Sequence, residues 1–129
     1  MKNKIIYWTS TSLVSLVMLY SAYGYMTNEQ LKGAFVHLGF PDYFRIELAA
    51  AKIIGVIFLM IPAIPVKLKE FAYFGFAITF VSAFIAHTFS GDPASAKAAP
   101  IIFSILLAVS YFYFLKLKSQ NKQHTIQIN

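Results

Sequence analysis

Ionisable side chains inside long apolar segments are the residues of this chain that could do chemistry. Such residues are rare at membrane depth and mark functional sites by default. A carboxylate, an ammonium group and an imidazole interrupt these segments, while tyrosines and a second carboxylate lie near segment ends. Together they could hold a small polar or amphipathic ligand through hydrogen bonds and charge. The predicted ligand-binding residues are Glu47, Lys52, His87, Tyr20, Tyr23 and Asp92.

Each of the three central candidates also has a purely structural explanation. Glu47 shares a helix face with Ala51 and Gly55, so we expect it to point inward, either towards a ligand or as hydrogen-bonding glue between helices. Lys52 either lines a polar pocket or extends its ammonium group towards the membrane interface. His87 has no second histidine one helical turn away, which favours an interhelical hydrogen bond over a metal ligand.

Several kinds of chemistry are not expected. The chain has no cysteine, which removes disulfides, thiol catalysis and thiolate metal sites. The remaining histidines, His37 and His124, fall in a loop and in a polar tail, so neither haem nor zinc is expected. Nucleotide-binding, zinc-protease and serine-hydrolase motifs are absent. We therefore predict no catalytic residue, no metal and no resident cofactor.

Four apolar stretches must position the candidate residues. They cover residues 5–26, 43–64, 70–89 and 98–117, each about 20 residues, the length with which an α-helix crosses about 30 Å of hydrocarbon. Only 12% of the 129 residues are charged, half of the about 25% usual in soluble domains. Because the connections are short, we predict an all-α fold, with residues 1–129 forming one antiparallel four-helix transmembrane bundle.

The longest connection, residues 27–40, predicts a short amphipathic helix on the membrane surface between spans one and two. Thr27 and Gln30 fit a capping box, and apolar residues, including Leu31 and Phe35, then recur with helical spacing. An irregular loop is the alternative. The polar tail, residues 119–129, is expected to fray.

Small residues on the apolar segments predict where helices pack closely. One stripe on the third segment contains Ala72, Gly75, Thr79, Ser82, Ala83 and Ala86. Helices in lipid associate through such stripes because hydrophobic burial gives them no net drive. We therefore expect replacement of Gly75 or Ala83 by leucine to disrupt the bundle more than replacement of Phe80 by leucine, because Phe80 lies off the stripe.

The net charge of +6 sets the predicted orientation. The termini and middle loop carry Lys2, Lys4, Lys67, Lys69, Lys116, Lys118 and Lys122, and the other side carries Lys32, Arg45 and Lys97. The positive-inside rule then predicts a cell-membrane (inner-membrane) protein with both termini cytoplasmic. Lysines at helix ends indicate contact with anionic lipid rather than nucleic acid.

A cleaved signal peptide is the alternative for the first stretch, residues 5–26. The length of this stretch exceeds the about 7–15 apolar residues of such peptides.

Antiparallel packing should bring the polar candidates together. The second span would enter from outside and the third would leave outward, so Glu47 and His87 should lie close to each other at the outer end of the bundle. Lys52 and Tyr20 or Tyr23 should be nearby. We therefore predict a polar pocket that opens towards the outer leaflet.

Motifs across residues 30–100 resemble the DoxX-like family of small four-helix membrane proteins. They are Leu38-Gly39-Phe40-Pro41, then Glu47, then Lys69-Glu70-Phe71-Ala72-Tyr73-Phe74-Gly75-Phe76, then Ala86-His87 and Gly91-Asp92-Pro93. The resemblance implies the four-span fold and matches Glu47, Glu70, His87 and Asp92 to recurrent polar positions. It implies no agreed catalytic residues, because members of the wider group look diverse. They include quinone-reducing subunits, partners of redox-defence proteins and a receptor-assembly chaperone.

Two classes of function follow from these observations. The first is a non-enzymatic membrane protein whose outer pocket holds a lipid-like or small amphipathic ligand, or which assists other membrane proteins as a partner or homo-oligomer. The second is the membrane subunit of a quinone-linked oxidoreductase, with quinone hydrogen bonds from residues such as Tyr20, Lys52 and His87. No electron-carrying cofactor can be traced in the sequence, which favours the first class.

Overall fold

The computed structural model describes residues 1–129, which form five helices and no strand. The helices are α1 (Lys2–Thr27), α2 (Glu29–His37), α3 (Asp42–Met60), α4 (Val66–Phe89) and α5 (Ala94–Ile128). Three of them, α1, α4 and α5, are long and apolar enough to cross a membrane. The 19 residues of α3 include four charged side chains, which lower its apolar character.

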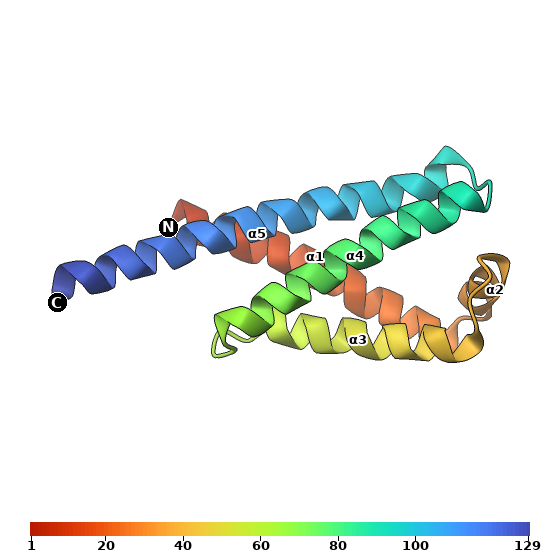
Figure 1. Cartoon of the computed structure of the whole chain (residues 1–129), viewed down its shortest axis with the longest axis horizontal. Helices are drawn as coiled ribbons and strands as arrows, with labels where there is room; N and C mark the ends of the chain where they lie inside the picture. Colours follow the sequence, from red (N-terminus) through yellow and green to blue (C-terminus); the bar gives the residue numbers. More distant parts are fainter.

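Each of the four long helices contacts two of the other three. α1 packs against α3 and α5, and α4 packs against the same two helices, whereas α1 and α4 make no close backbone contact. Figure 1 shows both termini and the α3–α4 turn at one end of the molecule, with α2 and the α4–α5 turn at the other. The end that carries α2 is called the α2 end below.

The short amphipathic helix is present as α2, which confirms the periodicity argument. Phe35 is 8% exposed and packs edge-on against Tyr25 of α1, with ring centroids 4.7 Å apart. The cap differs from the prediction, because Asn28 Oδ1 accepts from the Gln30 amide. Thr27 instead turns its hydroxyl back to the Tyr23 carbonyl of its own helix. Asn28 therefore fills the capping role expected of Thr27.

The core is aromatic, and the small-residue stripe on α4 was wrongly predicted to be its closest contact. Tyr73, Phe76 and Phe80 of α4 are at most 6% exposed. A Cβ at Gly55 would lie 2.6 Å from the Phe76 ring, so this glycine of α3 admits the aromatic side chain. A Cβ at Gly75 would meet nothing within 4 Å. Phe80, rather than Gly75, is therefore the position at which substitution should disturb packing.

A hydrogen-bonded cluster joins three helices inside this core. The Ser110 hydroxyl oxygen of α5 lies 2.6 Å from that of Thr11 on α1 and 2.7 Å from that of Tyr73 on α4. Thr11 and Ser110 are fully buried. Each hydroxyl supplies a partner for another, so the polar groups are satisfied without water.

Several predicted boundaries shift by a few residues. α3 ends at Met60 rather than at residue 64, because Pro62 and Pro65 cannot continue a helix. α5 begins at Ala94, which places Pro100 inside the helix rather than in its first turn. The tail predicted to fray is helical to Ile128, since it contains no glycine or proline that would end the helix, and Gln120, Lys122, Gln123 and Gln127 are good helix formers.

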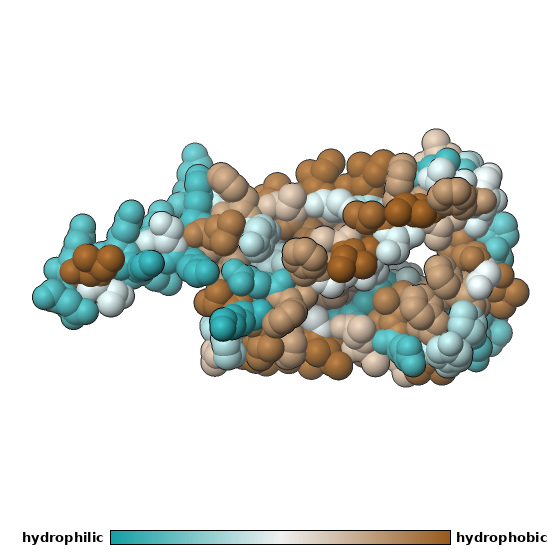
Figure 2. All heavy atoms as spheres, viewed as in Figure 1, coloured by the Kyte–Doolittle hydropathy of each residue, from teal (hydrophilic) through white to brown (hydrophobic).

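The surface divides into an apolar middle and polar ends. Figure 2 shows hydrophobic residues over the middle of the molecule and hydrophilic residues at the α2 end and along the projecting end of α5. Large apolar side chains are exposed on all four long helices, among them Leu16, Ile54, Phe74 and Ile105. Such a surface suits lipid, where exposed apolar groups carry no cost.

Candidate ligand-binding site

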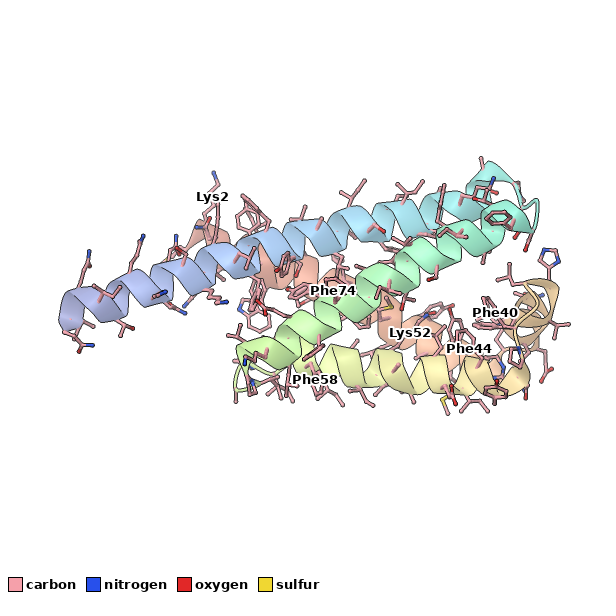
Figure 3. The ribbon with its side chains drawn as sticks, viewed as in Figure 1. Lys2, Phe40, Phe44, Lys52, Phe58 and Phe74 are labelled. Atoms are coloured by element: carbon pink, nitrogen blue, oxygen red, sulfur yellow. The ribbon has the colours of Figure 1, made fainter.

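Lys52 of α3 is the centre of the candidate site. Its side chain points into the space between α3 and α4 (Figure 3), and the residue is only 5% exposed. The ammonium Nζ donates to Ser21 Oγ and to Tyr25 Oη, both at 2.8 Å. It also lies 3.9 Å from the centroid of the Tyr25 ring. All of these partners are neutral and all come from α1, so the buried cation has no counterion.

The spacing of residues on α3 places Lys52 inside the bundle. The buried positions on this helix recur with a helical period and include Arg45, Ala49, Lys52 and Val56. They form the face that packs against α1, the helix with which α3 makes most of its contacts. Lys52 therefore faces the interior because of its register, and its long stem reaches the hydroxyl groups of α1.

Arg45 fixes the end of α1 beside the lysine. Its guanidinium donates to the Tyr25 carbonyl oxygen and, at 2.8 Å, to Asp42 Oδ1. Tyr25 lies in the last turn of α1, where carbonyl groups lack intrahelical partners and attract positive charge. Arg45 therefore orients the tyrosine whose phenol contacts Lys52, while Asp42 neutralises Arg45 and leaves Lys52 without a carboxylate.

Two cavities lie next to each other towards the α2 end of the bundle. The larger, about 530 Å³, lies among α1, α4 and α5 and is lined by Tyr20, Lys52 and His87. The smaller, about 380 Å³, lies beneath α2 and is lined by aromatic side chains, including Phe35, Phe40, Phe44 and Tyr25. Both are bordered by Tyr25, Thr79, Ala83 and His87, and Figure 2 shows an opening at this end of the surface.

A carboxylate between two histidines holds the α2 end together. Asp92 Oδ1 lies 2.9 Å from His37 Nε2, and Asp92 Oδ2 lies 2.7 Å from His87 Nδ1. Hydrogen bonds from His87 and then from His37 hold the pKa of Asp92 below its ordinary value, since they favour the charged carboxylate. We call His37, Asp92 and His87 the clasp. It ties the C-terminus of α2 to the α4–α5 turn, above the aromatic cavity.

The structure brings together four of the six predicted ligand-binding residues. Tyr20, Lys52 and His87 line one cavity, and Asp92 holds His87 from outside. Tyr23 is 68% exposed and lines neither cavity. This arrangement suits the placement argument from antiparallel packing, although ligand binding by these residues stays a prediction.

The prediction that Glu47 points into the bundle towards His87 is wrong. Glu47 is exposed and forms none of the five ion pairs of the chain. The buried face of α3 runs through Ala49 and Lys52, which turns Glu47 outward. His87 is satisfied by Asp92 instead. The expectation failed because Ala51 and Gly55 were taken to mark the face that packs most closely.

Sequence reasoning missed three partners in the site. Ser21 and Tyr25 hold the Lys52 ammonium, and His37 completes the clasp. Ser21 and Tyr25 are spaced by one helical turn on α1, a signal that a search for hydroxyl groups facing Lys52 could have used. His37 was predicted to lie in a loop. Its contact with Asp92 joins distant parts of the chain and leaves no local signal in the sequence.

No three His, Cys, Asp or Glu side chains are arranged to hold a metal ion. What the site offers is a buried ammonium group, hydroxyl groups and an apolar, aromatic wall. These groups can bind and orient an amphipathic molecule, with the polar part at Lys52 and the apolar part against the phenylalanines.

Residues 9–110 match the DoxX-like family, so the chain belongs to this family of proteins. The match includes the lysine, the clasp and both cavities. Neither a curated protein nor a solved structure is significantly similar to the chain.

Proposed function

We propose that the chain is a non-catalytic membrane protein that binds a lipid-like amphipathic molecule beside Lys52. The observation that carries this proposal is the ammonium group of Lys52, which is buried against neutral hydroxyl groups. A charge taken out of water is costly unless another charge compensates it. A ligand with an anionic head would supply that charge, and the adjoining cavities would take its apolar part.

We further propose that α3 crosses the membrane as the fourth helix of an antiparallel bundle. Its 19 residues rise about 28 Å, close to the thickness of the hydrocarbon core. Ile46, Ile53 and Ile57 are exposed on its outer face, as expected for contact with lipid. Of its charged residues, Arg45 and Lys52 are buried within the bundle, so they need not face hydrocarbon.

In this topology the α2 end lies at the outer face of the cell membrane, and both termini lie in the cytoplasm. The lysine-rich ends of α1 and α5 and the α3–α4 turn gather at the opposite end of the molecule (Figure 1). This charge bias supports the orientation by the positive-inside rule. The cavities would open towards the outer leaflet, where an amphipathic ligand could enter sideways from lipid.

A quinone is the second candidate ligand. The aromatic cavity is lined by Phe35, Phe40 and Phe44, and the imidazole of His87 borders both spaces. A flat ring between aromatic side chains, with a donor near one carbonyl, is a typical quinone environment. Under this reading the protein would be the quinone-binding membrane subunit of an oxidoreductase whose electron carrier lies in a partner protein.

The two candidates can be separated by what co-purifies with the protein. We would extract the wild type and the Lys52→Gln variant in a mild detergent, record absorption spectra and identify bound molecules by mass spectrometry. Lys97→Gln is the matched control, since Lys97 lies at the same end and forms no ion pair. We expect an anionic amphipath on wild type and Lys97→Gln but not on Lys52→Gln. Stoichiometric quinone would favour the second candidate, and equal lipid content in all three would contradict the site.

A further inference from the structure

An apolar crevice between α3 and α4 leads away from Lys52. Its volume is about 270 Å³, and Lys52 and Thr79 are its polar members. The remaining lining residues are Leu48, Ala51, Ile54, Gly55, Phe58, Phe71, Ala72, Gly75 and Phe76. Lys52 thus lines this crevice as well as the larger cavity, and the crevice is distinct from both cavities at the α2 end.

Small residues border this crevice. Ala51 of α3 lines the space, and a Cβ placed on Gly75 of α4 would meet nothing within 4 Å, whereas the room beside Gly55 is filled by the Phe76 ring. From Lys52 to Phe58 the helical rise gives about 9 Å of length along α3. The crevice is therefore apolar along about 9 Å of α3, with a positive charge at Lys52.

We propose that this crevice holds the acyl chain of a fatty acid whose carboxylate binds the Lys52 ammonium group. The inference rests on the proposed function and names the class of ligand. Lys52 is the only cation that lines the crevice, so it matches a single negative charge. No carboxylate of the chain competes, since Asp42 is paired with Arg45 and Glu47 is exposed. The Ser21 and Tyr25 hydroxyl groups, already within 2.8 Å of Nζ, are placed to donate to the carboxylate oxygens.

The acyl chain of a fatty acid would account for the apolar lining of the crevice. The volume of about 270 Å³ suits one acyl chain better than the two of a phospholipid. Phe58, Phe71 and Phe76 supply apolar contact along the chain. The charge pair at one end and the apolar contacts along the chain together select a molecule with both features.

The test uses a photoreactive fatty acid, palmitic acid carrying a diazirine on its chain, with the full-length protein in phosphatidylcholine nanodiscs. We expect saturable labelling of α3 and α4 peptides. Removing one partner of a buried charge pair leaves the other charge buried and unpaired, so Lys52→Gln should weaken binding more than about tenfold. Gly75→Leu should fill the crevice and also weaken binding about tenfold or more, without loss of thermal stability. The matched control is Gly33→Leu on α2, where a Cβ also meets nothing within 4 Å.

Each outcome decides a different part of the argument. Labelling that is lost in Lys52→Gln but unchanged in Gly75→Leu would overturn the crevice and leave the proposed site intact. Equal labelling of wild type and Lys52→Gln would show surrounding lipid only, and would overturn both. The methyl ester of the probe should bind at least tenfold more weakly than the acid, as for Lys52→Gln. Equal binding of ester and acid would overturn the assignment of the carboxylate.

Discussion

Lys52 Nζ lies 2.8 Å from the phenol oxygen of Tyr25, which joins a buried cation on α3 to the last turns of α1. Lys52 borders the larger cavity and the crevice between α3 and α4, and Tyr25 borders the larger cavity and the aromatic cavity beneath α2. The tyrosine is held in turn by Arg45, which bonds its carbonyl oxygen. The site is thus built between α1 and α3, and α4 supplies the opposite wall.

Replacing Lys52 by methionine should not destabilise the protein without ligand. The substitution keeps most of the length of the side chain and removes a buried charge that has no counterion. Exchange of buried charges for apolar groups of similar volume is neutral or raises the free energy of unfolding by about 1–4 kcal/mol. We expect an unchanged or higher melting temperature in detergent. A marked fall would mean that the hydrogen bonds to Ser21 and Tyr25, rather than ligand binding, are the reason for the lysine.

Replacing Asp92 by asparagine should release the C-terminus of α2 while the long helices stay folded. The amide keeps the shape of the side chain but removes the charge that accepts from both histidines. We expect faster amide hydrogen exchange in α2 than in wild type. His124→Asn, in the exposed tail, should leave this exchange unchanged. Equal exchange in all three proteins would contradict the clasp.

The docking of α2 should also depend on pH with a definite sign. Because the clasp lowers the pKa of Asp92, folding favours its charged form. The stabilisation is fully present above the ordinary pKa of 3.8 and is lost as the pH falls through the lowered value. Hydrogen exchange corrected for its intrinsic pH dependence should therefore show α2 docked at pH 5 to 7, about one unit or more above the ordinary aspartate value. Release of α2 in wild type only above pH 7 would contradict this sign.

Replacing Ser110 by alanine should destabilise the bundle by about 1–2 kcal/mol. The substitution leaves the buried Thr11 and Tyr73 hydroxyl groups without their shared partner. Ser104→Ala is the matched control on the same helix, since Ser104 bonds only the Pro100 carbonyl of its own helix. Thermal unfolding in detergent should separate the two variants. Identical melting temperatures would show that the cluster is dispensable.

A reporter fused after Asn129 should be active only if it is of the kind that works in the cytoplasm. The expectation follows from the excess of lysine at the end of the molecule that carries both termini. A reporter placed between Gly39 and Pro41 provides the opposite control, since that loop adjoins α2. Periplasmic activity of the C-terminal fusion would contradict the orientation.

The sequence predicted the helices well because each depends on local signals. Apolar length, the prolines near residues 62–65 and the spacing around Phe35 act over one or two turns. The end of α5 was missed because polarity was taken for fraying, although the tail contains no glycine or proline that would end the helix.

The side-chain partners could be predicted only in part, because rotation of each helix is set by packing. Topology placed Lys52, His87 and Tyr20 at the same end, and they do line one cavity. The rotation of α3 was inferred from its small residues, and for that reason Glu47 was wrongly predicted to point inward. In the structure the large aromatic side chains of α4 determine the contact, as Phe76 does against Gly55. Pairing of His37 with Asp92 joins distant parts of the chain and has no local signal.

A crystal structure of the protein grown from a lipid phase would show directly what lies beside Lys52. We expect density for an anionic head group within hydrogen-bonding distance of Lys52 Nζ, continuous with an apolar chain that leaves the site. We also expect this density to be absent from crystals of Lys52→Gln. An ammonium group contacted only by Ser21, Tyr25 and water, with the same lipid density in both proteins, would contradict the proposed site.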